Sequence, residues 1–175
     1  MLAIPPLAFA RVESGIYRSA YPTKKSFQYI LDNLSLKSLV CLCPNEIRSD
    51  IRDFASENSI VLKEYNIGFN QEPFVSMFEK PVQDAIDFIA DEINHPVLIF
   101  CITGQKKTSC VIGCFRRSLN WSLASVLHEY EQYNDPEGIL SDMIFIENFL
   151  WRTKIFIAVQ LSFYIYFTTE LVYDL

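Results

Sequence analysis

The sequence predicts an α/β domain in which a mostly parallel central sheet is flanked by helices. Short apolar runs of strand-like composition, such as 38–43 and 96–100, alternate with segments whose apolar residues recur at helical spacing. Strands that alternate with helices in this way are typical of a mostly parallel sheet. The length of 175 residues fits one compact domain with a sizeable core.

The N-terminal half is expected to form three strands and two helices after a short arm. Residues 1–10 lack a basic lead and Pro5-Pro6 interrupt their apolar run, so we expect an extended surface arm rather than a secretory signal. Asn45 is the expected N-cap of the helix that follows Pro44. In order, the expected elements are a strand at 15–19, a helix at 25–33, a strand at 38–43, a helix from 45 and a strand at 60–67.

The C-terminal half is expected to add one buried strand and four helices. Pro81 is placed to open a helix after a loop, because proline is tolerated in a first turn. Ser122 is the expected cap of a later helix. In order, the expected elements are a loop at 68–79, a helix from 81, a strand at 96–100, a loop at 101–107, and helices at 108–119, 122–133 and 142–151.

Composition and charge exclude several classes of function. The chain has 15 basic and 21 acidic side chains, a formal charge of −6, and 50% hydrophobic residues. This composition excludes disordered, collagen-like and low-complexity chains. The acidity argues against a general nucleic-acid binder, which needs a basic surface. A small anionic ligand remains compatible with it, because a few well-placed cations can hold one.

The five cysteines favour a reducing compartment. An odd number in a chain large enough to fold unaided argues against a disulfide framework. The pairs Cys41/Cys43 and Cys110/Cys114 lack the two-residue spacing of common zinc knuckles, so no metal site is expected. These thiols are instead predicted to be buried as small hydrophobic groups.

One loop carries the candidate chemistry. Cys101 follows the buried strand 96–100, and a helix is expected a few residues later. The intervening backbone can point successive N–H groups inward, and the helix N-terminus adds the positive end of its dipole. The pattern therefore predicts an anion cradle with a thiol at its base, whose phosphate-binding residues are Ile102, Thr103, Gly104, Gln105, Lys106 and Lys107.

The residue types in this cradle suit phosphoryl transfer. A helix N-terminus favours thiolate, so Cys101 is the expected nucleophile and would form a cysteinyl-phosphate. Gly104 allows a tight turn, Lys107 supplies a cation at the rim, and Thr108 can hydrogen-bond the thiolate or the leaving phosphate. A nucleotide P-loop fits poorly, because Cys101 and Lys106 occupy its glycine positions. Rhodanese-like and arsenate-reductase-like proteins share the strand–cysteine–loop–helix layout.

Short segments in a fixed order carry a more specific family resemblance. Ile16-Tyr-Arg-Ser-Ala-Tyr-Pro22 resembles the family element Ile-Tyr-Arg-Ser-Gly-Phe-Pro, and 36–44 is similar to its Leu-Lys-Ser-Ile-Ile-Tyr-Leu-Cys-Pro strand. Further matches are Pro5-Pro6-Leu7, Glu72-Pro-Phe-Val75, Asn94-His-Pro-Val-Leu-Ile99, Asn120-Trp-Ser122, Glu129-Tyr130 and Phe145-Ile-Glu147. From about Pro5 to Phe149 the chain resembles the plant and fungal atypical dual-specificity phosphatases, which include the oxidant-induced cell-cycle arrest proteins.

The resemblance implies a cysteine-phosphatase fold over residues 5–150 that uses no metal or other cofactor. It also implies cytoplasmic action on inositol pyrophosphates, with phosphotyrosine as a further substrate class. The expected partners are therefore phosphorylated small molecules or phosphoproteins, together with related phosphatase-like subunits. No nucleic-acid partner is expected, and a membrane is expected only if the C-terminal tail is an anchor.

The signature loop, residues 101–107, departs from the family pattern His-Cys-x-x-Gly-Lys-x-Arg-Thr-Gly. Phe100 replaces the histidine, Gln105 replaces the lysine and Lys107 replaces the arginine. An arginine grips two phosphate oxygens in a fixed fork, whereas a lysine is a point charge on a flexible stem. Two hypotheses follow: a slow cysteine phosphatase, or a pseudophosphatase that binds phosphate or a partner without turnover.

Glu72 is the candidate general acid. Its loop precedes the helix before the signature loop, a location similar to the acid loop of related phosphatases, although Gly68 stands where the family often has an acidic residue. A structural or surface role for Glu72 is the alternative. Arg18 with Lys24-Lys25 would suit an approach path for a polyphosphate. The favoured expectation, however, is that the basic residues outside the loop lie on a solvated face. These residues are Arg18, Lys24, Lys25, Arg116 and Arg117.

The tail at 151–175 is a second departure. Its apolar run at 155–167 is shorter than the roughly 20 residues that span a bilayer, and Gln160 interrupts it. Arg152 and Lys154 would lie on the cytoplasmic side of a tail anchor. The alternatives are an extra helix packed on the domain and an artefactual reading frame.

Overall fold

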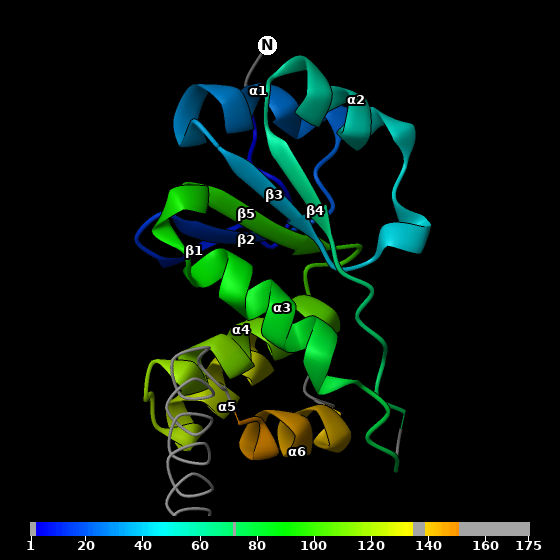
Figure 1. Ribbon diagram of the computed structural model, residues 1–175, viewed down its shortest axis with the longest axis vertical. Helices are drawn as coiled ribbons and strands as arrows, with labels where there is room; N and C mark the ends of the chain where they lie inside the picture. Colours follow the sequence, from blue (N-terminus) through cyan, green and yellow to red (C-terminus); the bar gives the residue numbers. More distant parts are fainter. Residues whose placement is uncertain (1–2, 72, 135–138, 151–175) are drawn as a thin grey trace, which may run out of the picture.

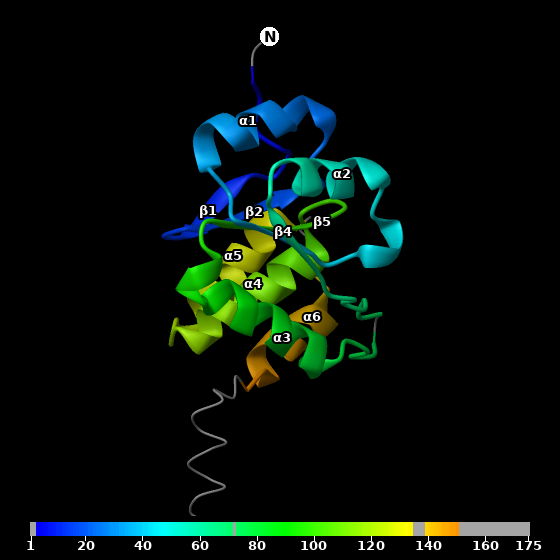
Figure 2. The ribbon, with the colours of Figure 1, turned by 45° about the horizontal axis from the view of Figure 1, so that its top comes forward.

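The computed structural model describes residues 3–71, 73–134 and 139–150, which form three layers. A five-stranded sheet lies between two groups of helices (Figure 1). Helices α1 (Lys24–Leu34) and α2 (Ser49–Glu57) cover one face. Helices α3 (Glu79–Ala90), α4 (Lys106–Ser118), α5 (Leu123–Tyr133) and α6 (Leu140–Asn148) lie on the other side, as the turned view also indicates (Figure 2). The predicted α/β fold is confirmed.

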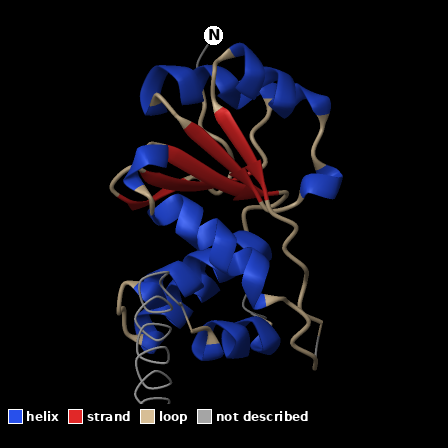
Figure 3. Ribbon diagram, in the orientation of Figure 1, coloured by secondary structure: helices blue, strands red, loops and turns tan. Residues whose placement is uncertain are grey.

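The sheet is parallel except at one edge. Its strands are β1 (Ala10–Glu13), β2 (Ile16–Ala20), β3 (Ser38–Cys41), β4 (Val61–Glu64) and β5 (Val97–Cys101), in the order β1-β2-β5-β3-β4 (Figure 3). Only β1 runs antiparallel, pairing with β2. The carboxyl ends of β2, β5 and β3 therefore meet at one edge of the sheet, which is where open parallel sheets place their ligand sites.

The core forms around β5, the central strand. All five of its residues are buried, as a strand covered on both faces requires. Helix α4 packs against it with a nearly continuous buried stretch that includes Cys110 and Cys114. All five cysteines are buried free thiols, and for Cys41, Cys43, Cys110 and Cys114 this confirms the predicted burial.

Several predicted element boundaries were wrong, and three of these differences have an identifiable cause. Residues Ala10–Glu13 form strand β1, although only Val12 in that segment is buried and the sequence pattern is correspondingly weak. Pro44–Glu46 form a short 3₁₀ turn, η1, so α2 begins at Ser49 and Asn45 is not its cap. Helix α4 begins at Lys106 rather than at 108, because the signature loop turns at Gly104.

The apolar tail at 151–175 lies outside the described residues, as does Glu72. Within the described ranges, no helix combines the length and the apolar character needed to cross a bilayer. The same ranges bring together no group of three or more His, Cys, Asp or Glu side chains that could hold a metal ion.

Candidate active site

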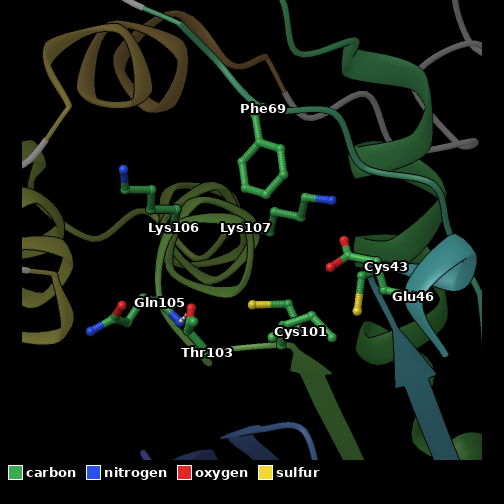
Figure 4. Close-up of a pocket in the computed structure, with 9 residues that line it drawn as sticks. Cys43, Glu46, Phe69, Cys101, Thr103, Gln105, Lys106 and Lys107 are labelled. Atoms are coloured by element: carbon green, nitrogen blue, oxygen red, sulfur yellow. Dashed lines mark hydrogen bonds between the residues drawn. The ribbon is translucent and has the colours of Figure 1, made fainter. Parts of the chain in front are cut away.

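A pocket of about 310 Å³ opens at the carboxyl edge of the sheet, beside the end of β5. Cys101 is the last residue of that strand and its Sγ faces the loop that follows (Figure 4). The pocket contains five of the six predicted phosphate-binding residues; the exception is Gly104. Its lining residues are Cys43, Glu46, Phe69, Cys101, Ile102, Thr103, Gln105, Lys106 and Lys107.

Gly104 shapes the loop from behind rather than touching the pocket. Its φ of +71° belongs to the left-handed region that favours glycine. A Cβ placed there would lie 2.5 Å from the backbone nitrogen of Ala20, so the loop is packed directly onto strand β2. The predicted turn at Gly104 is thus present, and β2 is the surface against which it is made.

The guanidinium of Arg18 holds the same turn. Its Nη2 donates to the Gly104 carbonyl at 2.9 Å and to the Ser109 hydroxyl at 2.6 Å. Arg18 is only 1% exposed, so its expected place on a solvated face was wrong. Burial lowers the pKa of this guanidinium to about 10, and its neighbours Tyr133, Glu129 and Cys101, in that order, act in the opposite direction.

The other basic residues outside the loop divide into buried and exposed groups. Arg116 is buried on α4, where its Nε donates to Glu129 at 3.0 Å and its Nη1 lies 3.5 Å from Glu13, so the expected solvated face was also wrong there. Lys24 and Lys25 are exposed at the start of α1, as predicted. These three residues and Arg117 do not line the pocket beside Cys101.

Lys107 lies in the first turn of α4 and is buried, with its Nζ 4.1 Å from the centroid of the Phe69 ring. A cation over an aromatic face is attracted by the ring quadrupole. In Figure 4 the ammonium lies on the Glu46 side of the pocket, whereas Lys106 extends away from Cys101. Lys107 is therefore the buried cation of the pocket, and Phe69 fixes where its charge lies.

Thr108 does not reach the pocket wall. The side chain is fully buried in α4, and its hydroxyl has no hydrogen-bond partner among the described residues. The proposed contact of this hydroxyl with a thiolate or leaving group thus remains a prediction. Glu72, the candidate acid, lies outside the described residues.

Phe100, the residue before Cys101 in β5, makes apolar contacts where a histidine could donate a hydrogen bond. It is fully buried and meets the ring of Tyr21 edge-on, with centroids 5.6 Å apart. This edge-on contact stabilises the packing of the two rings, but the Phe100 side chain has no hydrogen-bond donor for a thiolate. The loop is instead tied to β2 through Tyr21, whose N–H donates to the Ile102 carbonyl at 3.2 Å.

Three pocket residues escaped the sequence prediction: Cys43, Glu46 and Phe69. Cys43 and Glu46 follow β3, and Phe69 follows β4. Glu46 is the one acidic side chain among the described lining residues, and its carboxylate faces the pocket. The Cys43 Sγ lies 3.8 Å from the Cys41 Sγ, and this neighbour together with burial raises the pKa of Cys43. The sequence signal that could have indicated these three pocket residues is their place after β3 and β4, because neighbouring parallel strands end at the same edge of a sheet.

A cysteine that ends a central parallel strand, before a loop that turns at a glycine and leads into a helix, is an arrangement that cysteine-dependent phosphatases share with rhodanese-like and arsenate-reductase-like proteins. Residues 3–163 match the tyrosine phosphatase family. Inositol diphosphatase DSP4 of Arabidopsis thaliana is 38% identical over 148 residues, covering 85% of this chain and 74% of that protein. The chain belongs to the tyrosine phosphatase family.

Two further comparisons concern yeast SIW14. Inositol diphosphatase SIW14 of Saccharomyces cerevisiae is 35% identical over 144 residues, covering 82% of this chain and 51% of that protein. This chain therefore spans about half the length of the yeast relative. The solved catalytic core of Siw14 matches with a TM-score of 0.81 at 30% identity, covering 93% of this chain and 95% of that one.

Proposed function

We propose that this chain is a slow cysteine phosphatase that removes the terminal phosphate from the diphosphate group of an inositol pyrophosphate. The observation that carries the proposal is the position of Cys101 beside a pocket walled by the loop 102–107 and the N-terminus of α4. Relatives named inositol diphosphatases support this substrate class over phosphotyrosine.

The proposed reaction has two displacement steps. The Cys101 thiolate attacks the terminal phosphorus, and the bond from phosphorus to the leaving oxygen breaks as that oxygen takes the electron pair. Glu72 is the proposed donor of a proton to this oxygen, and Thr108 is proposed to assist its departure. Water then attacks the phosphorus of the cysteinyl-phosphate and gives a proton to the Glu72 carboxylate. The phosphorus–sulfur bond breaks, which releases inorganic phosphate and returns the thiolate and the protonated acid.

Two substitutions are expected to make this reaction slow. Lys107 offers one charged contact where a guanidinium would offer a fork, and its ammonium also packs on Phe69. Phe100 cannot donate a hydrogen bond to order the loop. Losing one such transition-state donor costs about 10²-fold in rate.

The same two residues favour a second candidate function, that of a pseudophosphatase. In that case the pocket binds a phosphorylated ligand, and the chain serves as a subunit beside related phosphatase-like proteins. Both candidates are proposed to act in the cytoplasm, where buried free thiols are stable.

Phosphate release distinguishes the two candidates. The assay offers an inositol pyrophosphate, a phosphotyrosine peptide and an aryl phosphate to wild type, Cys101→Ser and the double variant Phe100→His with Lys107→Arg. We expect wild type to exceed Cys101→Ser on the inositol pyrophosphate and the double variant to exceed both. If wild type equals Cys101→Ser while the double variant gains turnover, the chain is a pseudophosphatase. Turnover of the peptide alone would reassign the substrate to phosphotyrosine.

A further inference from the structure

A buried guanidinium lies directly behind the signature loop. One nitrogen of Arg18, Nη2, donates both to the Gly104 carbonyl in the loop and to the Ser109 hydroxyl in the first turn of α4. The guanidinium carbon lies 3.5 Å from the centroid of the Tyr133 ring at the end of α5. Arg18 therefore joins strand β2, the loop and two helices at one point.

This charge has no carboxylate partner among the described residues. No ion pair of Arg18 occurs there, and its Nε and Nη1 form no hydrogen bond within those ranges. Glu129, whose charge acts on Arg18, is bonded to Arg116 instead. A buried guanidinium without a carboxylate partner is costly, so an apolar side chain would serve the core better. The arrangement suggests that the compensating negative charge lies across the loop.

Cys101 is the group on that side. In the pairing of β2 with β5, Cys101 lies opposite Ala20, and Arg18 precedes Ala20 by two residues on the same face of the sheet. A thiolate or a bound phosphate at the loop would thus meet the field of Arg18 from behind. The hydrogen bond from the guanidinium occupies the Gly104 carbonyl, and Gly104 itself does not line the pocket.

We propose that Arg18 is a positioning residue of the signature loop: it holds the Gly104 carbonyl away from the bound phosphate and adds positive charge behind Cys101. This inference rests on the anion cradle of the proposed function. Arg18 touches neither the substrate nor the reacting atoms.

Several other charged groups surround Cys101 and Arg18, and the test must leave them in place. They are Cys43, which follows β3, Glu46 of η1, Lys106, Lys107 and Arg116 of α4, and Glu129 and Tyr133 of α5.

The test compares full-length wild type with Arg18→Met and Arg18→Lys. It measures the pH midpoint of Cys101 alkylation by iodoacetamide and the affinity for tungstate, an oxyanion probe. For Arg18→Met we expect the midpoint to rise by about one pH unit and tungstate to bind at least about tenfold more weakly, the effect of one lost charge-assisted contact. Arg18→Lys keeps the charge, so its midpoint should stay near wild type while its tungstate affinity falls.

Two controls separate this role from general stability. Arg52→Met removes an exposed arginine that pairs with Glu64 away from the pocket, and it should change neither measurement. Ser109→Ala removes one partner of Arg18 but keeps the Gly104 contact, so its tungstate affinity should stay close to that of wild type. If Arg18→Met does not fold, the tungstate affinity of Arg18→Lys still decides.

The outcomes distinguish failure of this proposal from failure of the proposed function. A folded Arg18→Lys or Arg18→Met variant that binds tungstate as wild type does, with an unchanged alkylation midpoint, overturns the role of Arg18 alone. A wild-type chain that binds no tungstate and whose Cys101 reacts like an ordinary thiol overturns the cradle itself, and with it both proposals.

Discussion

Gly104 is the single residue on which the geometry of the signature loop depends most directly. Its positive φ and the 2.5 Å approach to the Ala20 backbone leave no room for a side chain. We expect Gly104→Ala to lower the free energy of unfolding by about 1–3 kcal/mol, the usual cost of a strained backbone position. Because relief of the clash displaces the loop, tungstate affinity should fall with it, as urea unfolding and calorimetric titration would measure.

Gly68 provides the matched control for this substitution. A Cβ there would meet only the Ser76 carbonyl oxygen, at 3.9 Å, which is ordinary contact. Gly68→Ala should therefore leave unfolding and tungstate binding close to wild type. Equal effects of the two alanine substitutions would show that the approach to β2 does not shape the loop.

The pocket residues that are contiguous in the sequence could be predicted from it. The pocket residues contributed by distant segments could not. Cys101 and the loop after it form one motif, so the sequence indicates them together. Arg18 lies in a strand, where a charged residue ordinarily faces solvent, and nothing local marks it as buried. Phe69 reaches the pocket through the tertiary arrangement of a long loop, which has no sequence period to read.

At the scale of elements, the connection from β4 to α3 is fastened to α5 and α6 by a buried polar cluster. Asn70 donates to Asp142 at 2.7 Å, and its amide oxygen accepts the N–H groups of Ser76 and Met77. Tyr130 donates to the other Asp142 oxygen at 2.7 Å. Since Phe69 immediately precedes Asn70, the cluster fixes the loop that places Phe69 over Lys107.

Tyr130→Phe tests this cluster through its pH dependence. Burial and the Asp142 carboxylate raise the pKa of Tyr130 above its ordinary value of 10. Above pH 10 the unfolded chain releases this proton while the folded chain keeps it, so the stabilisation present below pH 10 is lost as pH rises. We expect Tyr130→Phe to unfold about 1–3 kcal/mol more easily at pH 8, because a buried acceptor loses its donor.

The difference between wild type and Tyr130→Phe should then narrow above pH 10, by about 1.4 kcal/mol for each pH unit. Urea unfolding of both proteins at pH 8 and pH 11 measures it. A difference that is the same at both pH values would mean that Tyr130 titrates alike in the folded and unfolded chains.

The predicted start of a helix agrees with the structure where a residue at that position determines it, such as a cap or a first-turn proline. Ser122 accepts the Ser125 N–H at 3.2 Å and begins α5 as predicted. Pro81 lies in the first turn of α3. The failures at β1 and α2 have tertiary or turn-level causes, since β1 exists through pairing with β2 and Pro44 starts a 3₁₀ turn.

At the scale of the whole molecule, the described site residues all lie before the apolar tail. The proposed domain boundary at residue 150 therefore predicts that a chain of residues 1–150 keeps wild-type tungstate affinity and Cys101 reactivity. Calorimetric titration of the shortened and full-length chains measures the first quantity. Cell fractionation of both chains tests the anchor, since only the full-length chain would then sediment with membranes. A shortened chain that unfolds would instead assign the tail to the core.

The contact between Arg18 and Gly104 joins positions 86 residues apart. Closing so long a segment is entropically costly and belongs to the slow, non-local part of folding. During synthesis the residues of β2 precede those of β5 and α4, so Arg18 exists before the loop that it contacts. We therefore expect Cys101 to lie beside the Arg18–Gly104 contact only after β2, β5 and α4 have packed together. The rate at which Cys101 is alkylated during refolding would report when that packing occurs.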